Sequence, residues 1–173
     1  PVGPEDGYYT STAIADRAVA WLEEHQGAHA NEPFLLYLAF TAPHFPIQAP
    51  QADVDRYRSR YDEGWDAVRL ARWNRQRELG LFDARLSERD PKTIPSWNLK
   101  EAELKARIGP GEAGYAVAWD ELTDEQKAFQ ATKMAIHAAM VDRLDREVGK
   151  VVAALEAAGT MDDTLILFAS DNG

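Results

Sequence analysis

The sequence predicts an α/β fold in which helices alternate with the strands of a parallel sheet. Residues 10–25 have apolar side chains at helical spacing and are followed by a continuous apolar run at 34–40. The same order recurs near the end, where a long amphipathic stretch at 124–158 precedes a second apolar run at 164–169. Helix–strand pairs that repeat along a chain are typical of parallel strands joined by right-handed crossovers.

The first helix–strand pair has clear boundaries. The stretch 10–25 begins with hydroxyl side chains, which we expect to cap the helix, and Gly27 lies just past its end. The run 34–40 lies between Pro33 and Pro43, and its length and continuous apolarity predict a strand buried on both faces. The residues expected on the buried face of the helix are Ile14, Ala18, Trp21, Leu22 and His25.

The second pair has signals at both helix ends. Thr123 and Gln126 have the spacing of a capping box, and Gly159 is a typical helix stop. The run 164–169 then predicts a second buried strand. The apolar residues that define the long helix are Phe129, Ile136, Met140, Val141, Leu144, Val148, Val151, Val152 and Leu155.

Between the two pairs lies a long excursion from the predicted sheet. Residues 51–79 have a helical pattern rich in arginine, whereas 81–122 is rich in Pro, Gly and Trp without a firm period. Connections of this length are usually functional. We therefore expect one domain over 1–173, divided into 1–50, the excursion at 51–122, and 123–173.

Composition excludes several classes of protein and site. The 173 residues are 45% hydrophobic and 28% charged, which is enough for a core and argues against disorder. The formal net charge of −10 argues against a nucleic-acid partner, and no apolar run approaches the roughly 20 residues that span a bilayer. The chain has no cysteine, which excludes thiolate zinc sites and cysteine nucleophiles within it. The sequence leaves compartment and oligomeric state open.

His44 is the first candidate functional residue. It directly follows the first predicted strand, between Pro43 and Pro46, which stiffen the loop. Ligands of open α/β sheets bind beyond the carboxyl ends of the strands, and a histidine there can bind an anion or transfer a proton. An ordinary loop histidine is the competing interpretation.

Asp171 and Asn172 form the second candidate, after the second predicted strand. Their oxygens suit calcium or magnesium, but calcium needs six to eight ligands, so others must come from elsewhere. An ordinary turn ending in Asn172 and Gly173 is the competing interpretation.

The remaining polar and aromatic residues carry weaker signals. We interpret the arginines of the excursion as a solvated face with acidic partners. The tryptophans are expected to anchor the excursion by packing, with a substrate cleft as the alternative. These tryptophans are Trp65, Trp73, Trp97 and Trp119. We expect His25 and His29, at the end of the first helix, to be solvated, and His137, within the long helix, to pack or to lie at the surface.

Three blocks of the sequence together resemble the sulfatase family, of the bacterial arylsulfatase type. Residues 32–46 resemble the family segment PFFLYLAFxAPHxPxQAP, and residues 61–81 resemble YDxGWDxxRxxRxxRQxELGL. Residues 140–173 resemble MVDRLDxxVGxVxxxLxxxGxxDxTLIxFxSDNG. The resemblance covers nearly the whole chain, and it implies an alkaline-phosphatase-like fold, in which this chain forms part of a large, mostly parallel sheet flanked by helices.

The resemblance also implies roles for three residues. His44 matches the histidine that contacts the sulfate ester and assists the leaving group, so it is expected to be both catalytic and substrate-binding. Asp171 and Asn172 match the second pair of ligands to an active-site Ca²⁺. The implied reaction is the hydrolysis of a small-molecule sulfate monoester through a formylglycine nucleophile.

Several features of the family are absent from this sequence. The early aspartate pair, the C/S-x-P/A-x-R motif that yields formylglycine, and the lysines and second histidine of the site cannot be placed in it. No leader is visible at Pro1, and the sequence stops at Asp171, Asn172 and Gly173 directly after a strand-like run, so we expect both ends to be cuts. We expect an internal fragment that is inactive alone, with formylglycine in the missing N-terminal part.

Two other functions remain open from the sequence. One is a phosphonate or phosphate monoester hydrolase of the same superfamily, which hydrolysis of aryl sulfate against aryl phosphate would distinguish. The other is a non-catalytic binding module that kept the fold and lost the nucleophile.

Overall fold

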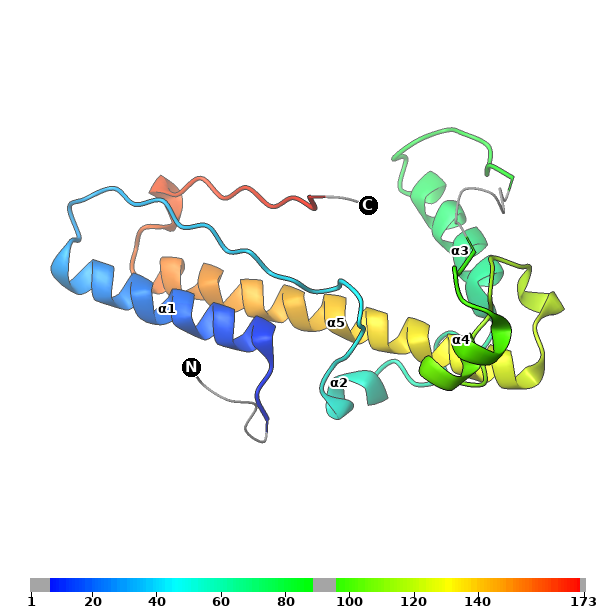
Figure 1. Cartoon of the computed structure of the whole chain (residues 1–173). Helices are drawn as coiled ribbons and strands as arrows, with labels where there is room; N and C mark the ends of the chain where they lie inside the picture. The colour runs from blue at the N-terminus through cyan, green and yellow to red at the C-terminus, as the bar shows by residue number, and fades with distance from the viewer. Residues whose placement is uncertain (1–6, 89–95, 172–173) are drawn as a thin grey trace. The chain divides into compact units, whose positions relative to one another are not determined.

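The computed structural model describes residues 7–88 and 96–171 and is helical (Figure 1). Two compact units are present: unit 1 comprises residues 1–50 and 140–173, and unit 2 comprises residues 51–139. Over the described residues, no helix has the length and apolarity needed to cross a membrane. The elements are α1 (Thr10–Ala28), α2 (Gln51–Asp55), α3 (Gly64–Glu78), α4 (Glu101–Arg107), the 3₁₀ turn η1 (Trp119–Glu121), α5 (Asp124–Ala157) and the 3₁₀ turn η2 (Met161–Asp163).

The predicted parallel sheet is wrong, because the described residues contain no strand. A strand exists only through hydrogen bonds to a neighbouring strand, and neither apolar run has such a partner here. Residues 34–40 and 164–169 are instead extended coil (Figure 1). Leu35 and Tyr37 are 94% and 86% exposed, so the first run is also not buried on both faces. A continuous apolar run indicates that the segment packs against other apolar residues, but it does not show that a partner strand is present.

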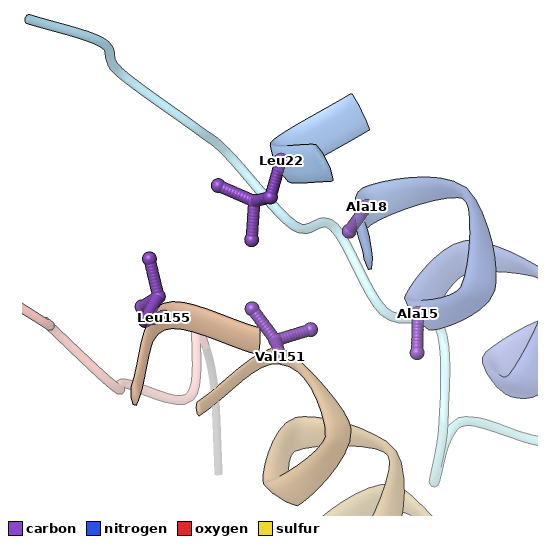
Figure 2. Close-up of a cluster of buried hydrophobic side chains, with 5 residues drawn as sticks. All are labelled: Ala15, Ala18, Leu22, Val151 and Leu155. Atoms are coloured by element: carbon purple, nitrogen blue, oxygen red, sulfur yellow. The ribbon is translucent and has the colours of Figure 1, made fainter. Parts of the chain in front are cut away.

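Alternate residues of the run 34–40 nevertheless contribute to the core of unit 1. This core is formed by α1 and the C-terminal part of α5, where Leu22 faces Val151 and Leu155 (Figure 2). Small side chains on α1 let the two helices approach closely. The residues of the run that pack against this core are Phe34, Leu36, Leu38 and Phe40. The period of two in their burial is that of an extended chain with one covered face.

The predicted faces of the two helices are partly right. Ala18 and Leu22 of α1 are buried as expected, but Trp21 is 37% exposed and Ala15 is buried instead. On α5, Met140, Val151 and Leu155 are buried, whereas Val141 is 44% exposed.

Both predicted end signals of α5 are confirmed. The Thr123 N–H donates to Gln126 Oε1 at 3.0 Å, and the Gln126 N–H donates back to Thr123 Oγ1 at 3.2 Å. At the other end Gly159 has a φ of +68°, and its N–H donates to the Glu156 carbonyl at 3.0 Å. The next N–H, of Thr160, donates to the Leu155 carbonyl at 3.1 Å. These two bonds complete a Schellman motif.

The helix predicted over 51–79 is two helices, α2 and α3, separated by turns. Ser59 and Gly64 lie in or next to this break with φ values of +63° and +80°. An α-helix has negative φ throughout, so these two residues interrupt it.

Two tryptophans anchor unit 2 by packing, as predicted. The rings of Trp65 and Trp119 meet edge to face with centroids 5.0 Å apart. The Trp65 Nε1–H donates to the Val117 carbonyl at 3.2 Å, and the Trp119 backbone N–H donates to Asp66 Oδ2 at 2.9 Å. Gly64 lies against the Trp119 ring, with no room for a Cβ. The Gly-Trp-Asp part of the YDxGWD resemblance therefore has a structural explanation.

Candidate functional site

His44 lies in the loop at 41–50, which follows the extended run. Its side chain is exposed, and its backbone N–H donates to the Thr41 carbonyl at 2.9 Å. The imidazole Nδ1 lies 2.5 Å from the Phe45 carbonyl oxygen. A carbonyl only accepts, so Nδ1 carries the hydrogen and Nε2 is the nitrogen that can meet a ligand. The loop thus fixes both the tautomer and the orientation of the ring.

Asp171 ends the second extended run and is exposed, while Asn172 lies outside the described residues. Throughout the described part of the chain, no group of three or more His, Asp or Glu side chains can hold a metal ion. The oxygen chemistry of Asp171 suits calcium, but one carboxylate falls far short of six to eight ligands. Among the described residues, Asp171 is therefore not part of a complete calcium site.

A buried ion-pair network lies in unit 1 between α1 and α5. Glu147 is only 1% exposed. Its Oε1 accepts from Thr12 Oγ1 at 2.7 Å and from Arg143 Nε at 2.8 Å, and its Oε2 lies 2.6 Å from Lys150 Nζ. Lys150 also reaches Asp16 on α1 at 2.9 Å. The Thr12 hydroxyl thus links α1 to α5. The predicted hydroxyl cap of α1 is wrong, since its N-cap residue, Tyr9, makes no side-chain capping bond.

The network stabilises the carboxylate form of Glu147 and the ammonium form of Lys150. Burial by itself raises the pKa of Glu147, but the hydrogen bonds from Lys150 and Thr12 and the charges of Lys150 and Arg143 together lower it below its ordinary value of 4.5. The hydrogen bonds to Glu147 and Asp16 raise the pKa of Lys150. Glu147 is therefore ionised at neutral pH.

The spacing of Glu147 in the sequence indicates this network, although the apolar pattern of the long helix does not include that residue. Glu147 stands four residues after Arg143 and four before Val151, so all three share one face of the helix. Val151 is a core residue. A charged residue on the buried stripe of a helix indicates a partner on the element packed against it.

A separate open hollow of about 380 Å³ lies at the C-terminal end of α1. Its walls include Trp21, His25, His29 and Glu32, and His29 Nδ1 lies 3.2 Å from Glu32 Oε1. His29 is exposed, as predicted, whereas His25 is half-buried, with its ring 5.2 Å from the rings of Trp21 and Phe34. His44 does not line this hollow.

The family model for sulfatases matches residues 1–173, the whole chain. The chain belongs to the sulfatase family. It is 35% identical over 166 residues to an uncharacterized sulfatase of Schizosaccharomyces pombe, covering 96% of this chain and 26% of that protein. It is 29% identical over 168 residues to an arylsulfatase of Klebsiella aerogenes, covering 97% and 31%. It is 25% identical over 166 residues to arylsulfatase K of Bos taurus, covering 91% and 25%.

The matched region is a minor part of each of these sulfatases. The chain spans about a quarter to a third of the length of the curated relatives it matches. The sulfatase resemblance predicted from the three sequence blocks is confirmed.

Proposed function

We propose that this chain is part of a sulfuric ester hydrolase of the arylsulfatase type. The single observation that carries the proposal is the match of the sulfatase family model to all 173 residues. The relative named as an arylsulfatase supports hydrolysis of sulfate monoesters in particular. The substrate of the whole protein is then a small molecule bearing a sulfate ester.

Within that reaction, His44 is the residue of this chain that acts on the ester. Its exposed ring and the carbonyl-bound Nδ1 leave Nε2 to approach an oxygen of the sulfate group. In the imidazolium form, in which both ring nitrogens carry a hydrogen, Nε2–H donates a hydrogen bond to that oxygen and can pass its proton to the departing alcohol or phenol. A loop held by its own backbone hydrogen bond keeps the ring in place for this role.

Asp171 and Asn172 are the proposed contribution of this chain to a calcium site. Calcium supplies positive charge that polarises sulfate oxygens when it is bound. In this proposal the other ligands and the formylglycine nucleophile come from the rest of a longer protein, since the chain spans only about a quarter to a third of its curated relatives. The isolated chain is accordingly inactive.

We expect the full-length protein that contains this chain to hydrolyse an aryl sulfate with a higher kcat/KM than the matching aryl phosphate, and the isolated 173 residues to behave differently. The isolated chain turns over neither ester and binds Ca²⁺ no tighter than millimolar by titration calorimetry, because it lacks most of the ligands. Preference for the phosphate would instead support a phosphate hydrolase, and turnover by the purified isolated chain would contradict its predicted inactivity.

A further inference from the structure

Tyr9 connects the buried ion-pair network of unit 1 to the loop that carries His44. Its hydroxyl donates to the carbonyl of Gln48 at 3.2 Å, across 39 residues of sequence. Gln48 lies four residues after His44 in the same loop. Tyr9 is also the N-cap residue of α1, so its backbone is fixed by the start of that helix.

Arg143 holds the ring of Tyr9 from the side of α5. The guanidinium carbon lies over this ring, 6.0 Å from its centroid. The same guanidinium donates from Nε and Nη2 to Thr12 Oγ1, at 3.2 and 3.0 Å, and its Nε pairs with Glu147. A planar group with several fixed donors has a defined orientation, which a flexible ammonium would not provide.

Glu147 fixes this arrangement from within the core. Only 2% of its side chain is exposed, whereas 24% of the Arg143 side chain is. Burying a carboxylate is unfavourable unless it is fully paired, and an apolar residue would pack between the helices without that penalty. Unlike an apolar residue, Glu147 can orient the guanidinium of Arg143 through their ion pair. That guanidinium in turn lies over the ring of Tyr9.

We propose that Tyr9, held by Arg143 and Glu147, is a positioning residue for His44. The connection runs from the buried carboxylate through the guanidinium and the phenol to the Gln48 carbonyl, and it limits the conformations of the loop at 41–50. Tyr9 does not touch the reacting atoms. Its effect on the reaction passes through the placement of His44, and the inference rests on the proposed function of that residue.

The test uses the full-length protein with Tyr9→Phe, which removes one oxygen and keeps the ring over Arg143. We expect kcat for an aryl sulfate to fall about 10- to 100-fold with little change in KM, because a small misplacement of a catalytic group has effects of this size. Hydrogen–deuterium exchange of the peptide covering 41–50 becomes faster in the same variant. Arg143→Lys, which keeps the charge and loses the planar group, increases this exchange in the same way.

A double-mutant cycle separates positioning from general stabilisation. In a His44→Ala background, adding Tyr9→Phe leaves kcat within about twofold, because its effect acts through the missing imidazole. Tyr115→Phe, at an exposed tyrosine of unit 2, is the matched control and changes neither quantity. The inference would be overturned if Tyr9→Phe lowered kcat by the same factor with and without His44→Ala. Hydrogen–deuterium exchange at 41–50 that stays unchanged in Tyr9→Phe would also overturn it.

The outcomes for the inference and for the proposed function can be told apart. An active unsubstituted protein with an unaffected Tyr9→Phe variant overturns the positioning role alone. An unsubstituted protein that hydrolyses no sulfate ester overturns the proposed function, while faster exchange at 41–50 in Tyr9→Phe still supports the holding of the loop.

Discussion

Replacing Glu147 with alanine is expected to lower the free energy of unfolding of this chain by about 3 kcal/mol. Breaking a buried ion pair by removing one partner costs about 3–5 kcal/mol, because the remaining charge is left without compensation. Arg143 is mostly buried, whereas Lys150 is 43% exposed and can regain hydration, which places the effect at the lower end. Urea denaturation followed by circular dichroism measures the change.

The matched control for this substitution is Glu103→Ala. Glu103 pairs with Arg107 at 2.8 Å on α4, at the same spacing of four residues, but both side chains are exposed. Exposed pairs contribute little, so we expect the urea midpoint to stay where it is. Equal effects of the two substitutions would contradict the view that burial gives the Glu147 network its importance.

The same carboxylate gives stability a defined dependence on pH. The native pKa of Glu147 is below its ordinary value of 4.5, so its contribution is complete above that pH and disappears as the pH falls through the native pKa. In Glu147→Gln this dependence is absent. The stability difference between the unsubstituted chain and Glu147→Gln should therefore narrow below about pH 4.5.

Gly64→Ala is expected to destabilise unit 2 by about 4–5 kcal/mol. An added Cβ would lie 2.0 Å from Cδ2 of Trp119, and the backbone φ of +80° is unfavourable for any residue with a side chain. The contact is with a ring that is buried against Trp65, so it cannot move aside cheaply. Effects this large arise when overpacking and backbone strain combine. Tryptophan fluorescence during urea denaturation reports on this unit.

Gly80→Ala separates the effect of backbone strain from the effect of the steric contact with Trp119. Gly80 has a φ of +68°, but nothing lies within 4 Å of the position its Cβ would take. Only the backbone strain remains there, and we expect a loss of about 1–2 kcal/mol. If both substitutions destabilised the chain equally, the contact between Gly64 and Trp119 would not be the main reason for the effect.

The local signals at the two ends of α5 predicted its boundaries correctly, whereas the hydroxyl cap expected for α1 is absent. The capping box at Thr123 and the glycine stop at Gly159 depend on hydrogen bonds within a few residues, and both are present. The predicted sheet depended on partners far away along the chain, and the described residues provide none. A run such as 34–40 has the same apolar pattern whether it pairs in a sheet or lies along two helices.

The position of His44 in an exposed loop was predictable from the sequence, but the side chains packed behind that loop were not. The loop that presents His44 follows from the prolines and from the end of the apolar run. The network behind that loop involves Tyr9, Thr12, Arg143 and Glu147, which are more than 130 residues apart at the extremes. Helical spacing places Glu147 on a buried face, but it does not identify which side chain of α1 meets it.

Whether His44 acts on the sulfate ester is decided by kcat/KM for an aryl sulfate in the full-length protein carrying His44→Ala. His44 is exposed, so the thermal midpoint should not change, whereas loss of a general acid lowers the rate about 10²–10⁴-fold. His25→Ala, at the separate hollow on α1, should retain full activity. A His44→Ala variant as active as the unsubstituted protein would show that this histidine does not act on the sulfate ester.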